Sequence, residues 1–124
     1  MHAIIIFLQW VVALGLVNVW LLRFNRATSY RGGQARTMRE EFAAYGLPAW
    51  SLLVVGTLKI GAAVALIAGA WFPRGVLPAA AVISILMVGA LAMHWRVQDS
   101  LKKYAPAFAI LVMSLTIVVS VMAY

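Results

Sequence analysis

Four long apolar runs divide the chain, and its polar residues gather in the segments between them. The runs cover residues 3–22, 48–71, 76–95 and 105–123. A helix needs about 20 apolar residues to cross the hydrocarbon core of a bilayer, and each run is about that long. The pattern therefore predicts an all-α membrane protein: a bundle of four transmembrane helices in which residues 1–124 form a single domain.

The composition agrees with this prediction. Hydrophobic residues make up 65% of the 124 residues and charged residues only 10%, whereas a soluble domain is about half apolar and one-quarter charged. So small a domain could not bury this much apolar surface in one core. A soluble globular domain and a disordered chain are both excluded, and the lipid bilayer is the expected surrounding. Because the chain contains no cysteine, disulfide and thiolate chemistry are excluded as well.

The basic residues indicate how the bundle lies in the membrane. The net charge is +7, and segments 23–47 and 96–104 together hold eight of the ten Lys and Arg residues, whereas Arg74 lies alone in the turn after the second run. The eight are Arg23, Arg26, Arg31, Arg36, Arg39, Arg96, Lys102 and Lys103. Basic loops stay in the cytoplasm and attract anionic lipid head groups. We therefore expect a multi-pass protein of the cell (inner) membrane with these two segments cytoplasmic, both termini outside and no nucleic-acid partner.

The first loop contains signals for a short amphipathic helix. Residues 37–40 form a capping box, and Gly46 supplies a C-terminal cap before Pro48 starts the second span. The apolar residues of this segment share one helical face: Met38, Phe42 and Tyr45. Two interpretations are open. The helix lies on the cytoplasmic leaflet as an interfacial helix, or it is a lid whose Glu40 and Glu41 close the cytoplasmic end of the bundle.

Lys59 is the only formal charge within a span. It lies about 16 Å along the second helix, near the middle of a hydrocarbon core about 30 Å thick. A lysine at that depth costs about 2.5–3.5 kcal/mol on insertion scales, so a functional role is the first hypothesis. Its neighbours on the helix face, Gly56, Ala62 and Ala63, are small. We therefore expect this face to point into the bundle.

Further polar residues are expected in the same half of the bundle as Lys59. Side chains lean toward the N-terminus of their helix, which directs Lys59 toward the depth of Asn18. His94 lies about one turn from the inner end of the third span. Together with Glu40 or Glu41 from the first loop, these residues predict one polar cluster that binds a ligand.

Structural explanations stay open beside the ligand hypothesis. Lys59 can bond to backbone carbonyls across helices, and His94 can be satisfied by water and Asp99. Small residues also recur every four positions on another face of the second span, where they indicate a helix-packing seam: Gly61, Ala65 and Gly69. No Ser-His-Asp arrangement, phosphate loop or ligand cluster occurs, so we expect neither catalytic residues nor a metal.

Several short motifs occur in a characteristic order. Residues 41–48 read Glu-Phe-Ala-Ala-Tyr-Gly-Leu-Pro, residues 56–59 read Gly-Thr-Leu-Lys, and an Ala-rich run ends in Gly-Ala-Trp-Phe-Pro at 69–73. The last motif, residues 94–107, contains His94, Asp99, Lys103 and Pro106. In these motifs, over nearly its whole length, the chain resembles the DoxX-like family of small four-helix membrane proteins.

The last motif also has a local explanation. Asp99 and Lys103 have the spacing of an i, i+4 ion pair, or of a cap near the start of the fourth span. Pro106 is compatible with the first turn of that helix. These residues are expected to make a well-formed helix entry.

The family resemblance implies the fold strongly and the activity weakly. Members include a membrane subunit of thiosulfate:quinone oxidoreductase and components of thiol and oxidative-stress systems, so a quinone is a possible cofactor. A eukaryotic chaperone for receptor assembly is similar around the segment from His94 to Asp99. Many relatives carry Glu at the position of Lys59, and the reversal to Lys favours an anionic or carbonyl-bearing ligand.

Three hypotheses follow. In the first, the chain is an accessory protein, not an enzyme on its own, that binds a quinone or lipid in the cytoplasmic half. Lys59 contacts the ligand's oxygen, and Asn18 and His94 orient it. In the second, the chain is a structural or chaperone-like partner of other membrane proteins or of a second copy, docking through its small residues. In the third, it is a membrane subunit of a quinone-linked thiol or sulfur oxidoreductase.

Overall fold

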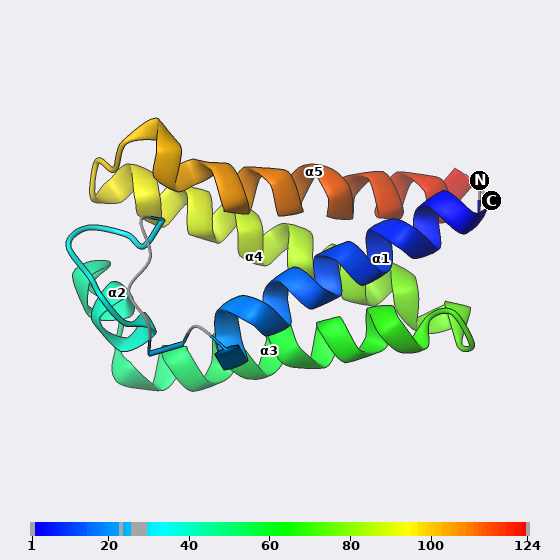
Figure 1. Ribbon diagram of the computed structural model, residues 1–124, viewed down its shortest axis with the longest axis horizontal. Helices are drawn as coiled ribbons and strands as arrows, with labels where there is room; N and C mark the ends of the chain where they lie inside the picture. Colours follow the sequence, from blue (N-terminus) through cyan, green and yellow to red (C-terminus); the bar gives the residue numbers. More distant parts are fainter. Residues whose placement is uncertain (1, 23, 26–29, 124) are drawn as a thin grey trace.

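The computed structural model describes residues 2–22, 24–25 and 30–123 (Figure 1). No strand occurs in these segments, which are mostly helical. In chain order the elements are α1 (His2–Val17), a π-helical turn η1 (Asn18–Leu22), α2 (Met38–Ala44), α3 (Ala49–Ala68), a 3-10 turn η2 (Pro73–Gly75), α4 (Val76–Arg96) and α5 (Leu101–Ala123).

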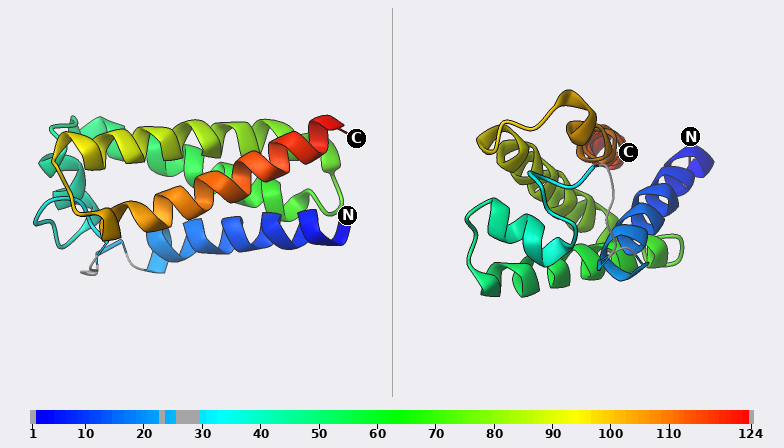
Figure 2. Two further views of the ribbon diagram at one scale, coloured as in Figure 1. Left: turned by 90° about the horizontal axis from the view of Figure 1, so that it is seen from above. Right: turned by 60° about the vertical axis from the view of Figure 1, so that its left-hand side comes forward.

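The four long helices pack into one bundle (Figure 2). α1 packs against α3 and α5, and α4 packs against α3 and α5. The short helix α2 and the α4–α5 turn lie at one end of the bundle, and the α3–α4 turn lies at the other (Figure 1). This arrangement confirms the predicted all-α fold with a short helix between the first two spans.

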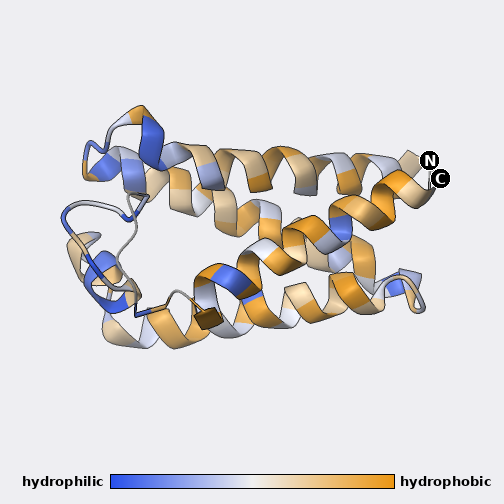
Figure 3. Cartoon of the chain, in the orientation of Figure 1, coloured by the Kyte–Doolittle hydropathy of each residue, from blue (hydrophilic) through white to orange (hydrophobic). Residues whose placement is uncertain are grey.

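The distribution of hydrophobic residues is that of a protein surrounded by lipid. Four helical segments are long and apolar enough to cross a membrane: Ala3–Leu22, Ala49–Ala68, Pro73–Arg96 and Leu101–Ala123. Large apolar side chains such as Leu53 and Ile85 are exposed on their outer faces. Polar residues gather around α2 and the α4–α5 turn (Figure 3). The chain is therefore a multi-pass membrane protein.

Two helix boundaries differ from the sequence prediction. α3 ends at Ala68 instead of residue 71, because the amides of Trp71 and Phe72 turn back to the Ala68 carbonyl. α5 begins at Leu101 instead of residue 105. The expectation that Pro106 lies in the first turn is therefore wrong: it lies inside the helix, where it cannot donate a hydrogen bond to the carbonyl four residues earlier. The residues that precede it are good helix formers, and they extend the helix backward.

The centre of the bundle is apolar and closely packed. Leu66, Ile83 and Ile117 are completely buried, together with small residues that let the helices approach. Ala62 and Ala63 are among these, which confirms that their face of α3 points inward. Some polar groups inside the bundle bond to one another or to the backbone: Gln9 donates to the Leu66 carbonyl over 3.0 Å, and the Ser84 hydroxyl reaches the Ser114 hydroxyl over 3.1 Å.

The π-helical turn at the end of α1 places Trp20 against α3. Such turns are rare, and they often occur at functional sites. The indole of Trp20 is buried and lies directly over Gly56. A Cβ atom at position 56 would lie 2.8 Å from Cζ3 of that ring. Gly56 therefore leaves the space that the indole occupies.

We expect Gly56→Ala to lower the free energy of unfolding by about 1–3 kcal/mol, because the added methyl group forces a buried ring out of its place. Unfolding in mixed detergent micelles measures this loss. Gly61→Ala is the matched control on the same helix, since a Cβ there meets nothing within 4 Å. Equal stability of the two variants would contradict this packing.

Candidate functional site

The carboxylate of Asp99 joins the first loop to the α4–α5 turn. Its Oδ1 accepts a hydrogen bond from the backbone N–H of Gly33 over 2.9 Å, and its Oδ2 lies 2.6 Å from Nδ1 of His94. The ammonium of Lys103 lies 3.6 Å from Oδ1 and donates to the Gly33 carbonyl. One residue of the loop is thus bound through both its amide and its carbonyl. The backbone can fold there because Gly33 has φ of +58°, which glycine adopts without strain.

The surroundings of Asp99 stabilise its charged form. Burial by itself raises the pKa of this carboxyl, since its side chain is only 4% exposed. The hydrogen bonds from His94 and Gly33 and the positive charge of Lys103 act in the opposite direction and outweigh burial. The net effect holds the pKa of Asp99 below its ordinary value of 3.8. Asp99 is therefore an anion at neutral pH.

A second carboxylate, Glu41 of α2, is held within the first loop. Its Oε2 accepts from Nη1 of Arg31 over 3.1 Å, and its Oε1 accepts from the Tyr45 hydroxyl over 2.7 Å. Arg31 is buried and also donates to the Phe24 carbonyl over 3.2 Å. Burial and the neighbouring charge and hydrogen bond of Glu41 raise the pKa of Tyr45. The phenol therefore stays protonated and acts as a donor.

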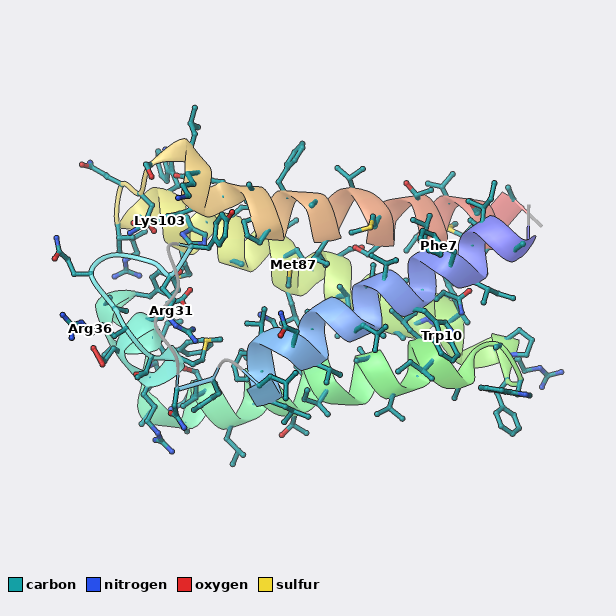
Figure 4. All side chains as sticks on the ribbon, in the orientation of Figure 1. Phe7, Trp10, Arg31, Arg36, Met87 and Lys103 are labelled. Atoms are coloured by element: carbon teal, nitrogen blue, oxygen red, sulfur yellow. The ribbon has the colours of Figure 1, made fainter. Side chains whose placement is uncertain are left out.

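Aromatic rings connect the two carboxylate groups. The ring of Tyr45 meets His94 edge-on with centroids 5.9 Å apart, and the ring centroid of Tyr104 lies 5.5 Å from that of His94. Figure 4 shows Arg31 and Lys103 at this same end of the bundle. The residues around Glu41 and Asp99 form one layer, here called the polar layer: Arg31, Gly33, Glu41, Tyr45, His94, Asp99 and Lys103.

The ends of α2 match the signals in its sequence. Thr37 is the N-cap and accepts from the amide of Glu40 over 3.2 Å, which confirms the first half of the capping box. The Glu40 side chain reaches back to the amide of Arg36 instead of that of Thr37. At the other end, Gly46 has φ of +76°, and the amides of Gly46 and Leu47 return to the carbonyls of Ala43 and Phe42. These two bonds are those of a Schellman motif, so the predicted glycine cap is confirmed. Pro48 then precedes α3 as its N-cap residue.

The apolar face of α2 packs against the bundle. Met38 and Phe42 form a buried cluster with Trp20 of η1 and Leu52 of α3. The ring of Phe42 meets the indole of Trp20 edge-on, with centroids 5.9 Å apart. The short helix therefore covers this end of the bundle, as the lid interpretation expects. Its two glutamates differ, because Glu41 is turned inward, whereas Glu40 is exposed and belongs to the cap.

Beneath this cover lie two N–H donors without an acceptor among the described residues. Nε1 of the buried Trp20 has no hydrogen-bond partner. The ammonium of the half-buried Lys59 lies 5.1 Å from the centroid of the same indole. Lys59 thus leans toward the N-terminal end of α3, as helix geometry predicts. We call Trp20, Gly56 and Lys59 the Trp20–Lys59 site.

The structure separates the predicted cluster into two groups. His94 and Glu41 lie in the polar layer, where the contact of His94 with Asp99 is the structural role left open for it. Lys59 belongs to the Trp20–Lys59 site, and Asn18 is half-buried at the start of η1. Ligand binding by these residues stays a prediction.

Sequence reasoning missed the importance of Trp20, Arg31 and Gly33. No sequence pattern assigns a role to Trp20, and Arg31 counts only as one of the basic residues of the first loop. The Gly-Gly pair at positions 32–33 was the signal for a special backbone conformation there.

The small-residue stripe of α3 does not lie on one interface. Gly69 is buried against Val76 and Gln9, and Ala65 packs at the edge of the core. Gly61 instead faces open space, in a shallow hollow between α3 and α4. The packing role is therefore internal at Gly69, whereas Gly61 is free to meet lipid or another helix. In the described segments no group of three or more His, Cys, Asp or Glu residues is placed to hold a metal ion.

We expect Asp99→Asn to lower the free energy of unfolding at pH 7 by about 3 kcal/mol, since removing one partner of a buried ion pair costs about 3–5 kcal/mol. A lowered pKa means that the stabilisation by Asp99 is present at neutral pH and is lost as the pH falls through that pKa, below 3.8. The wild-type and Asp99→Asn unfolding curves should therefore converge in acid. Glu40→Gln, at the exposed carboxylate, serves as control. Equal stability of Asp99→Asn and wild type at pH 7 would rule out the anchoring role.

Comparisons with known proteins agree with the fold. The family model described as the DoxX-like family matches residues 16–118. The chain is 32% identical over 80 residues to "Uncharacterized protein YdgD" of Bacillus subtilis (strain 168), a match that covers 64% of this chain and 70% of that protein. No solved structure gives a significant match. The chain belongs to the DoxX-like family.

Proposed function

We propose that this chain is an accessory protein of the cell (inner) membrane that binds a lipophilic molecule through an oxygen-bearing head group. The binding position is the Trp20–Lys59 site, and a quinone or a lipid is the proposed ligand. The observation that carries the proposal is the pair of donors, the Lys59 ammonium and the Trp20 indole N–H, which find no acceptor among the described residues. A buried donor such as the Trp20 N–H is normally satisfied, and the half-buried Lys59 ammonium has no ion-pair partner among the described residues. An acceptor from a bound molecule accounts for both.

Each neighbouring residue has a proposed role. Lys59 contacts the ligand's oxygen, and Gly56 leaves room for the indole that lies beside the ammonium. Asn18 orients the head group from the π-helical turn. His94 and Glu41 act through the polar layer, where they hold the first loop and α2 over the end of the bundle. Glu40 contributes by capping α2.

We expect Lys59→Met to lose the small molecule that co-purifies with the wild-type protein after gentle detergent extraction. The charged donor is removed while the length of the side chain is nearly kept. Quantitative mass spectrometry of the bound small molecules should show a loss of at least tenfold, which corresponds to about 1.4 kcal/mol. Trp20→Phe, which keeps a ring but removes the N–H, should show a smaller loss. Full retention in Lys59→Met would disprove the proposed function.

Gly61→Leu is the control, and it also tests a second candidate function. A Cβ at position 61 meets nothing within 4 Å, and the position opens onto the hollow between α3 and α4, so this variant should keep the ligand. The open hollow beside Gly61 favours docking of a helix from another membrane protein or a second copy, since small residues let transmembrane helices approach closely. Loss of a co-purifying protein in Gly61→Leu, with no Lys59-dependent ligand, would support this candidate instead.

The proposed orientation places the end of the bundle with α2 and the α4–α5 turn in the cytoplasm. Among the described residues, Arg31, Arg36 and Arg39 of the first loop lie at the same end as the basic residues of this turn, and Arg74 of η2 lies at the other end. Positive loops favour the cytoplasmic side. The Trp20–Lys59 site then belongs to the cytoplasmic half of the bilayer.

The absence of native cysteine makes single-cysteine labelling a direct test of this orientation. A membrane-impermeant maleimide added to intact cells, or to spheroplasts where an outer membrane blocks the reagent, should label Arg74→Cys. It should label Gln34→Cys only after the membrane is opened. Both positions are exposed in the structure, so they are matched for access. The reverse labelling pattern would show that the orientation is wrong.

A further inference from the structure

We infer that the head group at the Trp20–Lys59 site is anionic, a carboxylate or phosphate carried by a membrane amphiphile. This inference rests on the proposed function, because it names the chemical class of the same ligand. It follows from the number of acidic side chains in the full sequence and from the groups that each of them contacts.

The chain has only three acidic side chains, Glu40, Glu41 and Asp99. All three lie in the described part, and each is engaged away from Lys59. Both oxygens of Glu41 are occupied, by the Tyr45 hydroxyl and by Arg31.

The other two carboxylates are engaged in the same way. Both oxygens of Asp99 are occupied, Oδ1 by the Gly33 amide and Oδ2 by His94. Glu40 is exposed on α2, and its Oε1 accepts from the amide of Arg36 over 3.4 Å. None of the three carboxylate side chains therefore pairs with Lys59.

The charges of the polar layer also balance without Lys59. Arg31 compensates Glu41, and Lys103 compensates Asp99. No ion pair joins Lys59 to a described residue. A positive charge in an apolar surrounding is costly unless an opposite charge accompanies it. The counter-ion that stabilises a charged Lys59 therefore comes from outside the chain.

The surroundings of Lys59 define what can bring this counter-ion. Lys59 lies within the apolar helix α3, so the anion has to be attached to an apolar body that enters the bilayer. The face of the Trp20 indole attracts the ammonium but supplies no negative charge. A carboxylate or phosphate supplies the negative charge that Lys59 lacks, whereas a neutral carbonyl leaves the charge of Lys59 unbalanced.

Native mass spectrometry of the full chain in lipid nanodiscs tests the inference. The discs contain phosphatidylcholine with a small fraction of one added amphiphile: oleate, phosphatidylglycerol or the neutral decyl-ubiquinone. We expect the wild type to retain an anionic amphiphile at least tenfold more than Lys59→Met does. Lys59→Arg should keep most of this retention, because the charge is preserved. Lys102→Met, at an exposed lysine in the first turn of α5, should behave like the wild type.

The possible results separate the inference from the proposed function. Lys59-dependent retention of oleate assigns a carboxylate, and that of phosphatidylglycerol assigns a phosphate. Retention of decyl-ubiquinone alone, lost in Lys59→Met, overturns the anionic head group but supports the proposed function. Equal anion retention by wild type and Lys59→Met overturns the inference, as does a co-purifying protein that supplies the carboxylate. If no amphiphile is retained, both proposals fail.

Discussion

The carboxylate of Asp99 is the contact on which the closed end of the bundle depends. It receives the amide of Gly33, the imidazole of His94 and the charge of Lys103 at one point, so the long first loop is attached to the turn between α4 and α5. Within the loop, Arg31 pairs with Glu41 of α2 and also donates to the Phe24 carbonyl. Without this attachment, α2 would be connected to the bundle mainly through its apolar face, and polar groups near the membrane would lose their partners.

The fold could be predicted from the sequence because its constraints are local and repetitive. Each span is a continuous apolar run, and a helix is the form in which one segment satisfies its own backbone in lipid. The N-cap at Thr37 and the C-terminal cap at Gly46 each act within one helical turn, so both ends of α2 could also be predicted from the sequence. The boundary at Leu101 was not, because an apolar run does not show that a helix extends back into polar residues.

The candidate site was only partly predictable, since its contacts join residues far apart in the chain. The rarity of a charge within a span identified Lys59, and helix geometry gave the direction of its side chain. Its neighbour Trp20 depends on the π-helical turn of η1, which no residue pattern marks. The polar layer depends on Gly33 reaching Asp99, a contact across 66 positions. Spacing within one element could place His94 and Asp99 near each other, but it could not show that a loop glycine completes their set.

The small number of acidic residues bears both on how α2 is held over the end of the bundle and on why Lys59 has no carboxylate partner. This basic chain has only three acidic side chains. Asp99 and Glu41 attach the first loop, and Glu40 helps to begin α2. All three lie at one end of the bundle. Moving Glu41 toward Lys59 would leave Arg31 buried without its anion and Tyr45 without its acceptor. Breaking such a buried pair costs several kcal/mol, more than one extra contact with Lys59 would return. The arrangement that closes the bundle is thus the same one that leaves Lys59 to be neutralised from outside.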